Sequence, residues 1–160
     1  MSDIDVIVNK KLSLERCVNQ INKYYSLPSA TEFKQDYLKQ DAICINLQRI
    51  CEICIDIANY TIRRKQLGLP KTSADSFQLL YEAEIIQQHQ LNSLKGMVAF
   101  RNILVHQYIE IDLGILVDMI SNHLEEPVEF AQIIAELFNT WKSNLKPQTS
   151  NLKPQTSNLK

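Results

Sequence analysis

The sequence contains little glycine and little proline, with three Gly and five Pro among 160 residues. Because these two residues interrupt helices and form turns, their scarcity excludes a chain composed mainly of turns. Leu, Ile, Gln, Glu and Lys are abundant instead, and they favour helix. The length and the apolar content of 45% fit one domain with a modest core. The sequence therefore predicts a single all-α domain.

Long apolar segments are also absent. No apolar run approaches the roughly 18 residues that a membrane-spanning helix requires. The N-terminus carries Asp3 and Asp5, whereas a secretion signal begins with basic residues before an apolar core. We therefore expect a cytoplasmic protein without a membrane partner.

The chain has no excess of positive charge, since its net charge is −1. Residues 141–160 hold four of the 17 basic residues and no acidic one, so residues 1–140 carry 13 basic residues against 18 acidic ones, a net charge of −5. This balance excludes binding of nucleic acid by bulk charge, and a DNA partner is not expected. A site for RNA must therefore be a small, local basic pocket.

Cysteine is scarce, and the spacing of the four cysteines is incomplete for a metal site. Cys51 and Cys54 form a C-x-x-C pair that is compatible with half of a zinc site or with a redox pair, but no second C-x-x-C or H-x3-H partner exists. The pair lies among Ile residues on an expected buried helix, as Cys17 and Cys44 lie in helical segments. We interpret the cysteines as core residues, expect no metal and no cofactor, and note that free thiols suit a reducing cytoplasm.

Helical spacing of apolar residues predicts about five helical regions. They cover about Ile4–Tyr25, Thr31–Leu67, Asp75–Ala83, Gln88–Val105 and Leu113–Trp141, the last interrupted near Pro127. Asp112 is the expected N-cap of the last region. Arg63, Arg64 and Lys65 close the second helix, where cations interact favourably with the helix dipole, and this interpretation is preferred to an RNA contact.

The segment Gly96–Glu110 places four polar groups in an otherwise apolar stretch, namely Arg101, Asn102, His106 and Tyr108. Arg is a permanent cation whose fork of donors suits phosphate, and His both takes and gives protons near neutral pH. Together they suffice, without a metal, to cleave RNA. His takes a proton from a ribose 2′-hydroxyl or donates one to the leaving oxygen, while Arg stabilises the charged phosphorane.

The geometry of this segment depends on where its helix ends. In an unbroken helix Arg101 and His106 lie about 140° apart around the axis. We therefore expect the helix to end near Val105–His106, so that the chain bends and brings His106 and Tyr108 back over Arg101. Asp56, on the second helix, is compatible with orienting a catalytic group across the bundle, but a solvent-paired side chain is the simpler interpretation.

The string R-N-x-x-x-H-x-Y, running from Arg101 to Tyr108, resembles the signature of the HEPN ribonuclease superfamily, in particular the R-x4-H-x-Y motif of the HepT toxins of HepT–MntA toxin–antitoxin pairs. The run Leu94–Phe100 is similar to the approach to the family's arginine, and Leu47–Asn59 resembles its second-helix pattern. The resemblance covers about residues 4–140 and shows no departure at the Arg, Asn, His or Tyr position.

The resemblance implies an all-α, HEPN-type helical bundle that forms two-fold homodimers with both motifs facing one cleft. It implies a toxic, metal-independent endoribonuclease in which Arg101 and His106 are catalytic and Asn102 supports them. It further implies a partner, an MntA-like minimal nucleotidyltransferase antitoxin that transfers AMP from ATP to Tyr108. The RNA substrate, tRNA or mRNA, is left open.

The last residues form an internal repeat. Ser143–Thr149 reads S-N-L-K-P-Q-T, Ser150–Thr156 repeats it, and Ser157–Lys160 begins a third copy. The proline of each unit is expected to prevent a continuous helix, and one leucine per unit buries too little surface to offset ordering. We therefore expect a HEPN domain at 1–142 and a flexible, disordered repeat tail at 143–160.

Two other interpretations compete with the toxin hypothesis. The protein could be a non-catalytic nucleotide-binding or docking subunit for a nucleotidyltransferase, with Arg101 and His106 holding a nucleotide phosphate, which the acidic domain favours slightly. Alternatively the motif only packs in a helical bundle. That last interpretation does not explain why four polar residues interrupt an apolar segment.

Overall fold

The computed structural model describes the backbone of residues 1–106 and 111–150 and the side chains of residues 1–106 and 111–141. Within these ranges the chain contains α-helices, one short 3-10 helix at Phe33–Gln35 and no strand. The α-helices are α1 Asp3–Ser26, α2 Tyr37–Lys65, α3 Ser73–Glu82, α4 Gln88–His106, α5 Leu113–Asn122 and α6 Glu125–Ser150. The predicted all-α class is thus confirmed, with six α-helices in the described ranges where about five were predicted. None of the described helices has the length and apolar character needed to cross a bilayer.

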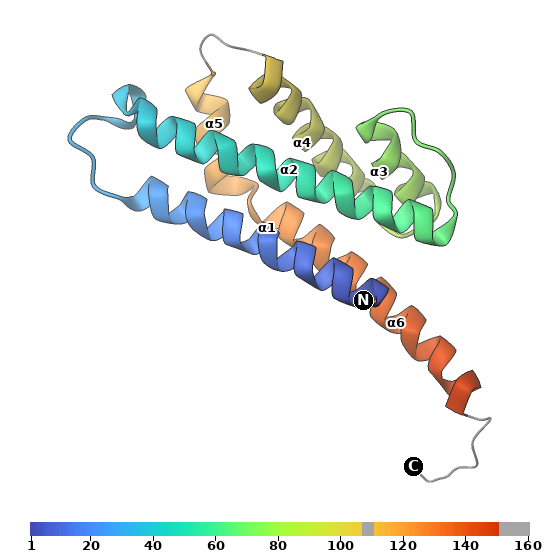
Figure 1. Ribbon diagram of the computed structural model, residues 1–160. Helices are drawn as coiled ribbons and strands as arrows, with labels where there is room; N and C mark the ends of the chain where they lie inside the picture. The colour runs from blue at the N-terminus through green and yellow to red at the C-terminus, as the bar shows by residue number, and fades with distance from the viewer. Residues whose placement is uncertain (107–110, 151–160) are drawn as a thin grey trace.

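Helix α2 is the centre of the bundle (Figure 1). Helix α1 packs antiparallel along it, and α6 packs against both α1 and α2. Helices α3 and α4 pack against each other and against α2. Because α2 contacts helices on several sides, its buried residues recur around most of its circumference, as expected for a central helix.

Side-chain caps determine where the helices begin. Asp112 accepts a hydrogen bond from the backbone N–H of Gly114 at 2.8 Å and starts α5, which confirms the predicted cap. Asp36 accepts one from Lys39 N at 3.0 Å and starts α2. The prediction that this helix begins at Thr31 is therefore wrong, because the cap lies at Asp36 and the residues just before it form only the 3-10 turn.

The predicted break near Pro127 lies slightly earlier in the structure. Helix α5 ends at its C-cap His123, and α6 begins at Glu125. Pro127 belongs to the first turn of α6, where backbone N–H groups have no partner inside the helix, so a residue without an N–H is tolerated there. The fifth predicted region is consequently two helices.

Helix α6 extends to Ser150, so residues 143–150 are helical. The expectation that the proline of the first repeat prevents a continuous helix is wrong for these residues. Pro147 removes one backbone hydrogen bond, but extending an existing helix needs no new nucleation. Residues 151–160, the rest of the predicted tail, lie outside the described residues.

The core lies between α2 and the helices around it. Phe77 of α3 and Phe130 of α6 are fully buried, and their rings meet edge to face at 5.6 Å between centroids. At the C-terminal end of α2, the Lys65 ammonium lies 4.8 Å from the centroid of the Trp141 ring, which attaches α6 to the end of α2. These contacts hold α2, α3 and α6 in fixed relative positions, and α4 packs onto that unit.

Candidate functional site

The motif segment forms the C-terminal turns of α4, which ends at His106. The predicted helix end near Val105–His106 is confirmed. His106 is itself the last helical residue, so it keeps the helical angle of about 140° from Arg101 and does not fold back over it. Tyr108, the predicted modification site, lies outside the described residues.

Arg101 is held by two neighbouring helices. Its Nη1 atom lies 3.6 Å from Glu52 Oε2 of α2, and its Nη2 donates a hydrogen bond to Ser73 Oγ of α3 at 3.1 Å. The side chain is only 20% exposed. Two elements far apart in sequence therefore fix the guanidinium before any ligand arrives.

One donor of Arg101 is left over. Its Nε is buried and has no hydrogen-bond partner among the described residues. Buried N–H donors without partners are costly and rare in native proteins. The buried Nε is not accessible to a ligand, so the capacity of Arg101 for a further acceptor such as a phosphate oxygen lies in the partly exposed end of its guanidinium.

Asn102 and His106 are exposed, in contrast to Arg101. Within the described part of the chain, neither side chain makes a hydrogen bond, and none joins either residue to Arg101. Helix α4 thus presents the fixed guanidinium of Arg101 and, on another side of the helix, the accessible imidazole of His106. Both residue types are available for the chemistry predicted from sequence, but the structure does not bring them into contact.

The carboxylate that holds Arg101 belongs to Glu52, which the sequence analysis did not consider. It considered Asp56 for orienting a catalytic group and preferred a solvent-paired side chain there. Both belong to α2 and lie four residues apart on one helix face, so periodicity cannot distinguish them. Asp56 is exposed and has no hydrogen-bond or ion-pair partner within the described ranges. Ser73 was missed as well, because it comes from another helix and carries no local signal.

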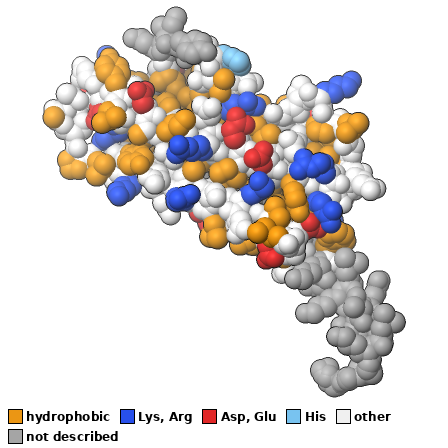
Figure 2. Space-filling model, viewed as in Figure 1, with side chains coloured by type: hydrophobic (Ala, Val, Ile, Leu, Met, Phe, Trp, Pro, Cys, Tyr) orange, Lys and Arg blue, Asp and Glu red, His pale blue; other side chains and the backbone are white. Residues whose placement is uncertain are grey.

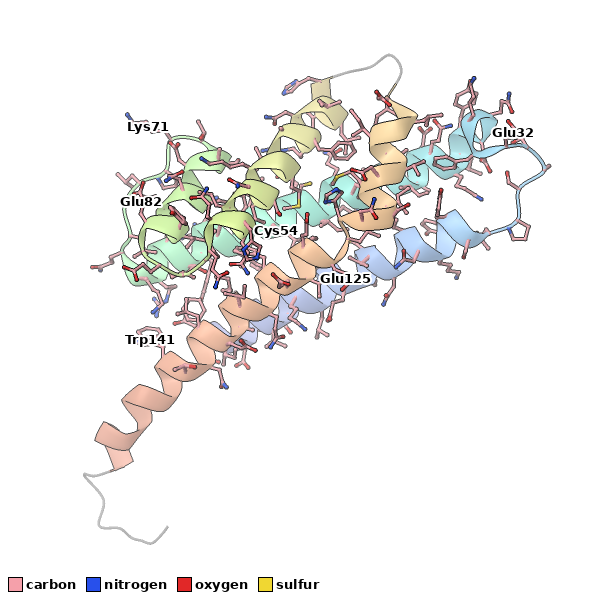
Figure 3. All side chains as sticks on the ribbon, turned by 180° about the vertical axis from the view of Figure 1, so that it is seen from behind. Glu32, Cys54, Lys71, Glu82, Glu125 and Trp141 are labelled. Carbon is pink, nitrogen blue, oxygen red and sulfur yellow. The ribbon has the colours of Figure 1, made fainter. Side chains whose placement is uncertain are left out.

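The cysteines near this site are structural. Burial raises the pKa of the Cys51 thiol to about 12, even though the nearby Arg101 charge lowers it, and burial raises that of Cys54 well above its usual value. Cys54 lies in the middle of the bundle (Figure 3). No group of three or more metal-binding side chains occurs in the described ranges. Core packing is confirmed for Cys17, Cys51 and Cys54, which are buried, while Cys44 is partly buried.

The other two histidines differ from His106. His89 is exposed near the start of α4. His123 caps α5, and its Nε2 and Nδ1 lie 3.0 Å from Asp118 Oδ2 and 3.0 Å from Glu126 Oε1. Burial lowers the pKa of His123, but the hydrogen bonds and charges of Glu126 and Asp118 outweigh this effect and raise it. His123 therefore joins α5 to α6.

Comparison with known proteins identifies the family. A family model described as "Ribonuclease HepT-like" matches residues 14–134, which include Glu52, Ser73 and the Arg101–His106 motif. The chain belongs to the HepT-like ribonuclease family. The HepT-like chain is also 45% identical over 130 residues to the mRNA nuclease HepT of Shewanella oneidensis, covering 81% of this chain and 96% of that protein.

Solved structures of similar HEPN proteins confirm the HepT-like fold. A tri-AMPylated HEPN toxin of Shewanella oneidensis, in complex with an MNT antitoxin, has a TM-score of 0.75 at 45% identity, covering 84% of this chain and 98% of that one. A toxin–antitoxin complex with AMP-PNP has a TM-score of 0.75 at 44% identity, covering 81% and 97%. The HEPN-type all-α bundle predicted from sequence is therefore confirmed.

Proposed function

We propose that this chain is the toxin of a type VII-like toxin–antitoxin pair and acts as a metal-independent endoribonuclease through its R-x4-H-x-Y motif. Its membership in the HepT-like ribonuclease family and its likeness to an mRNA nuclease support this proposal. The single observation that carries it is the end of α4, where Arg101 is fixed by Glu52 and Ser73 while His106 is open to solvent.

In the proposed reaction, His106 removes the proton of a ribose 2′-hydroxyl, and the 2′-oxygen attacks the adjacent phosphorus. The bond from phosphorus to the 5′-oxygen breaks, and that oxygen takes a proton from a second imidazole or from water, leaving a 2′,3′-cyclic phosphate. Arg101 stabilises the charge that develops on the phosphorane oxygens, and Asn102, beside it, supports the phosphate. The reaction needs no redox step.

The proposed active unit is a homodimer. Arg101 and His106 of one copy lie about 140° apart around α4, so a single copy presents few groups to one phosphate. A two-fold axis near the end of α4 doubles the groups in one cleft and allows the arginine of one copy to act with the histidine of the other.

The proposed antitoxin is an MntA-like minimal nucleotidyltransferase that transfers AMP from ATP to Tyr108. The similar HEPN toxin is tri-AMPylated and bound to an MNT antitoxin, which supports this partner. In this proposal a phosphodiester on Tyr108, seven residues after Arg101 in the sequence, adds negative charge that competes with the RNA phosphate for Arg101. The likeness to an mRNA nuclease favours mRNA over tRNA as substrate. We propose that the reaction takes place in the cytoplasm, where mRNA and ATP are both present.

The second candidate is a non-catalytic nucleotide-binding or docking subunit for a nucleotidyltransferase, which the excess of acidic residues over basic ones in the domain favours. Incubation of the purified protein with mRNA and tRNA, without ATP and with a chelator, separates the two. We expect cleavage that ends in cyclic phosphates. Binding of ATP without any RNA cleavage would instead support the docking subunit.

The modification is tested separately by intact mass. We expect the protein expressed with its nucleotidyltransferase to gain the mass of one or more AMP groups, and Tyr108→Phe to gain none. The gain should abolish RNA cleavage, because the added phosphate competes at Arg101. An unchanged mass in the presence of active partner and ATP contradicts the modification but leaves the nuclease proposal to the RNA assay.

A further inference from the structure

A polar groove of about 560 Å³ lies between α1 and α2. Figure 2 shows several Lys and Arg side chains on the face that these two helices form. The groove residues that matter here are Arg16 and Gln20 of α1 and Gln48, Arg49 and Glu52 of α2. None of them except Glu52 belongs to the site described above.

Arg16 and Arg49 are exposed cations without partners. Neither makes an ion pair or a hydrogen bond within the described part of the chain. Two acidic residues, Glu52 and Asp56, line the same groove, but Glu52 lies 3.6 Å from Arg101, and among the described residues neither carboxylate forms an ion pair with Arg16 or Arg49. The two guanidinium groups therefore keep their donors free for another acceptor. Their arrangement therefore favours an anionic ligand.

Arg16 belongs to α1 and Arg49 to α2, so the two arginines lie on opposite walls of the groove. The charges of both affect the thiol of Cys17, which also lines the groove. Burial raises the pKa of the Cys17 thiol, and the charges of Arg49 and Arg16 both oppose that rise. Both guanidinium groups thus lie close enough to the Cys17 sulfur to affect it. Gln20 and Gln48 add neutral amide donors along the same groove.

The groove leads to the catalytic arginine. Arg49 and Glu52 are three residues apart on α2, so their side chains are neighbours on one helix face. Glu52 lines the groove and also pairs with Arg101 at 3.6 Å, so Arg101 lessens the negative charge at this point. Asp56 also lines the groove, one turn beyond Glu52 along α2. Arg49 lies in the opposite direction from Glu52 along the helix, so the path from Arg101 to Arg49 runs away from Asp56.

We infer that this groove binds the backbone phosphates of single-stranded RNA next to the scissile phosphate, with Arg49 nearer to the cleavage site and Arg16 on the opposite wall. Arginine suits this ligand because its planar fork donates two parallel hydrogen bonds to a phosphate. A single strand fits because its backbone is free to turn into a groove between two packed helices. This inference rests on the proposed ribonuclease function.

The first test measures binding of a 2′-O-methyl RNA oligonucleotide, which lacks the attacking hydroxyl, over a range of salt concentrations. For single strands each phosphate contact contributes roughly 0.7 to the slope of log K against log salt. We expect Arg49→Gln and Arg16→Gln each to weaken binding several-fold at low salt and to reduce that slope by about 0.7. Arg49→Lys should keep the slope but bind more weakly than the parent, because it keeps the charge and loses the fork.

The matched control is Arg63→Gln. Arg63 belongs to the same helix as Arg49, is exposed and makes no ion pair among the described residues, but it lies in the last turn of α2, outside the groove. Arg63→Gln removes the same charge as Arg49→Gln but does so outside the groove. We therefore expect no change in the slope of log K against log salt. Circular dichroism and melting temperatures should be unchanged for all four variants, because each replaces an exposed side chain.

A cleavage assay separates this inference from the proposed function. We expect Arg49→Gln to slow cleavage of a long RNA several-fold more than it slows cleavage of a dinucleotide, which has no phosphate beyond the scissile one. If the parent protein cleaves no RNA, the proposed function fails. If the parent cleaves RNA but Arg49→Gln and Arg16→Gln have the same salt slope as the parent, only the inference that the groove binds RNA is overturned. Weaker self-association or weaker binding of the nucleotidyltransferase with an unchanged slope also overturns it, and identifies a protein interface.

Discussion

The C-terminal end of α4 and the junction between α5 and α6 each carry a histidine. The two histidines differ in solvent exposure and in the partners of their ring nitrogens. His106 is exposed and unbonded within the described ranges, whereas both ring nitrogens of His123 lie 3.0 Å from carboxylates of Asp118 and Glu126. An imidazole with both nitrogens engaged has no lone pair to offer a substrate. Accessibility and free ring nitrogens, more than the presence of a histidine, therefore distinguish the proposed catalytic site from a structural one.

The largest expected difference between the two regions is in activity. We expect His106→Ala to reduce RNA cleavage by roughly 10²–10⁴-fold, because it removes the proposed proton-transfer group, with little change in melting temperature. His123→Ala should show the opposite pattern, with near-parental cleavage and a lower melting temperature. Cleavage rates and thermal melts of the two variants, measured side by side, check this. Parental cleavage by His106→Ala would show that the proposed mechanism is wrong.

Much of this contrast is visible in the sequence, because it depends on local patterns. The helical bundle follows from the spacing of apolar residues, and the cap at Asp112 follows from its place before an apolar run. The string that contains Arg101 and His106 is contiguous, so its position at the end of a helix is predictable as well.

The surroundings of Arg101 are not predictable in the same way. Glu52 and Ser73 reach it from two other helices, and their contacts depend on packing angles that no local pattern encodes. The start of α2 at Asp36 was missed for a related reason, since Thr31 followed by Glu32 also has the pattern of a helix start. Two local start signals five residues apart compete there, and the chain uses the cap at Asp36.

The orientation of Arg101 depends on its ion pair with Glu52. We expect Glu52→Gln to lower kcat roughly tenfold, with a smaller effect on KM, because Arg101 loses the partner that orients it before substrate arrives. Glu52→Asp should recover part of the loss, since it keeps the charge. Asp56→Asn is the matched control on the same face of α2 and should leave kcat unchanged. An equal loss in Glu52→Gln and Asp56→Asn would indicate a general effect of negative charge and contradict a positioning role.

The smallest expected effect concerns the pH dependence of the α5–α6 junction. The carboxylates raise the pKa of His123 on folding, so protonation of His123 stabilises the folded state. That stabilisation is complete below the unfolded pKa of about 6.5 and is lost as the pH rises through the higher folded value. The melting temperature of the parent should therefore exceed that of His123→Gln by roughly 2 °C near pH 5.5, and by less near pH 8.5, since the side chain is partly exposed. His89→Gln, which alters an exposed histidine of α4, is the control and should follow the parent across this range. A gap between parent and His123→Gln that widens with rising pH would contradict the sign of the effect and show that the neutral imidazole is the form that joins α5 to α6.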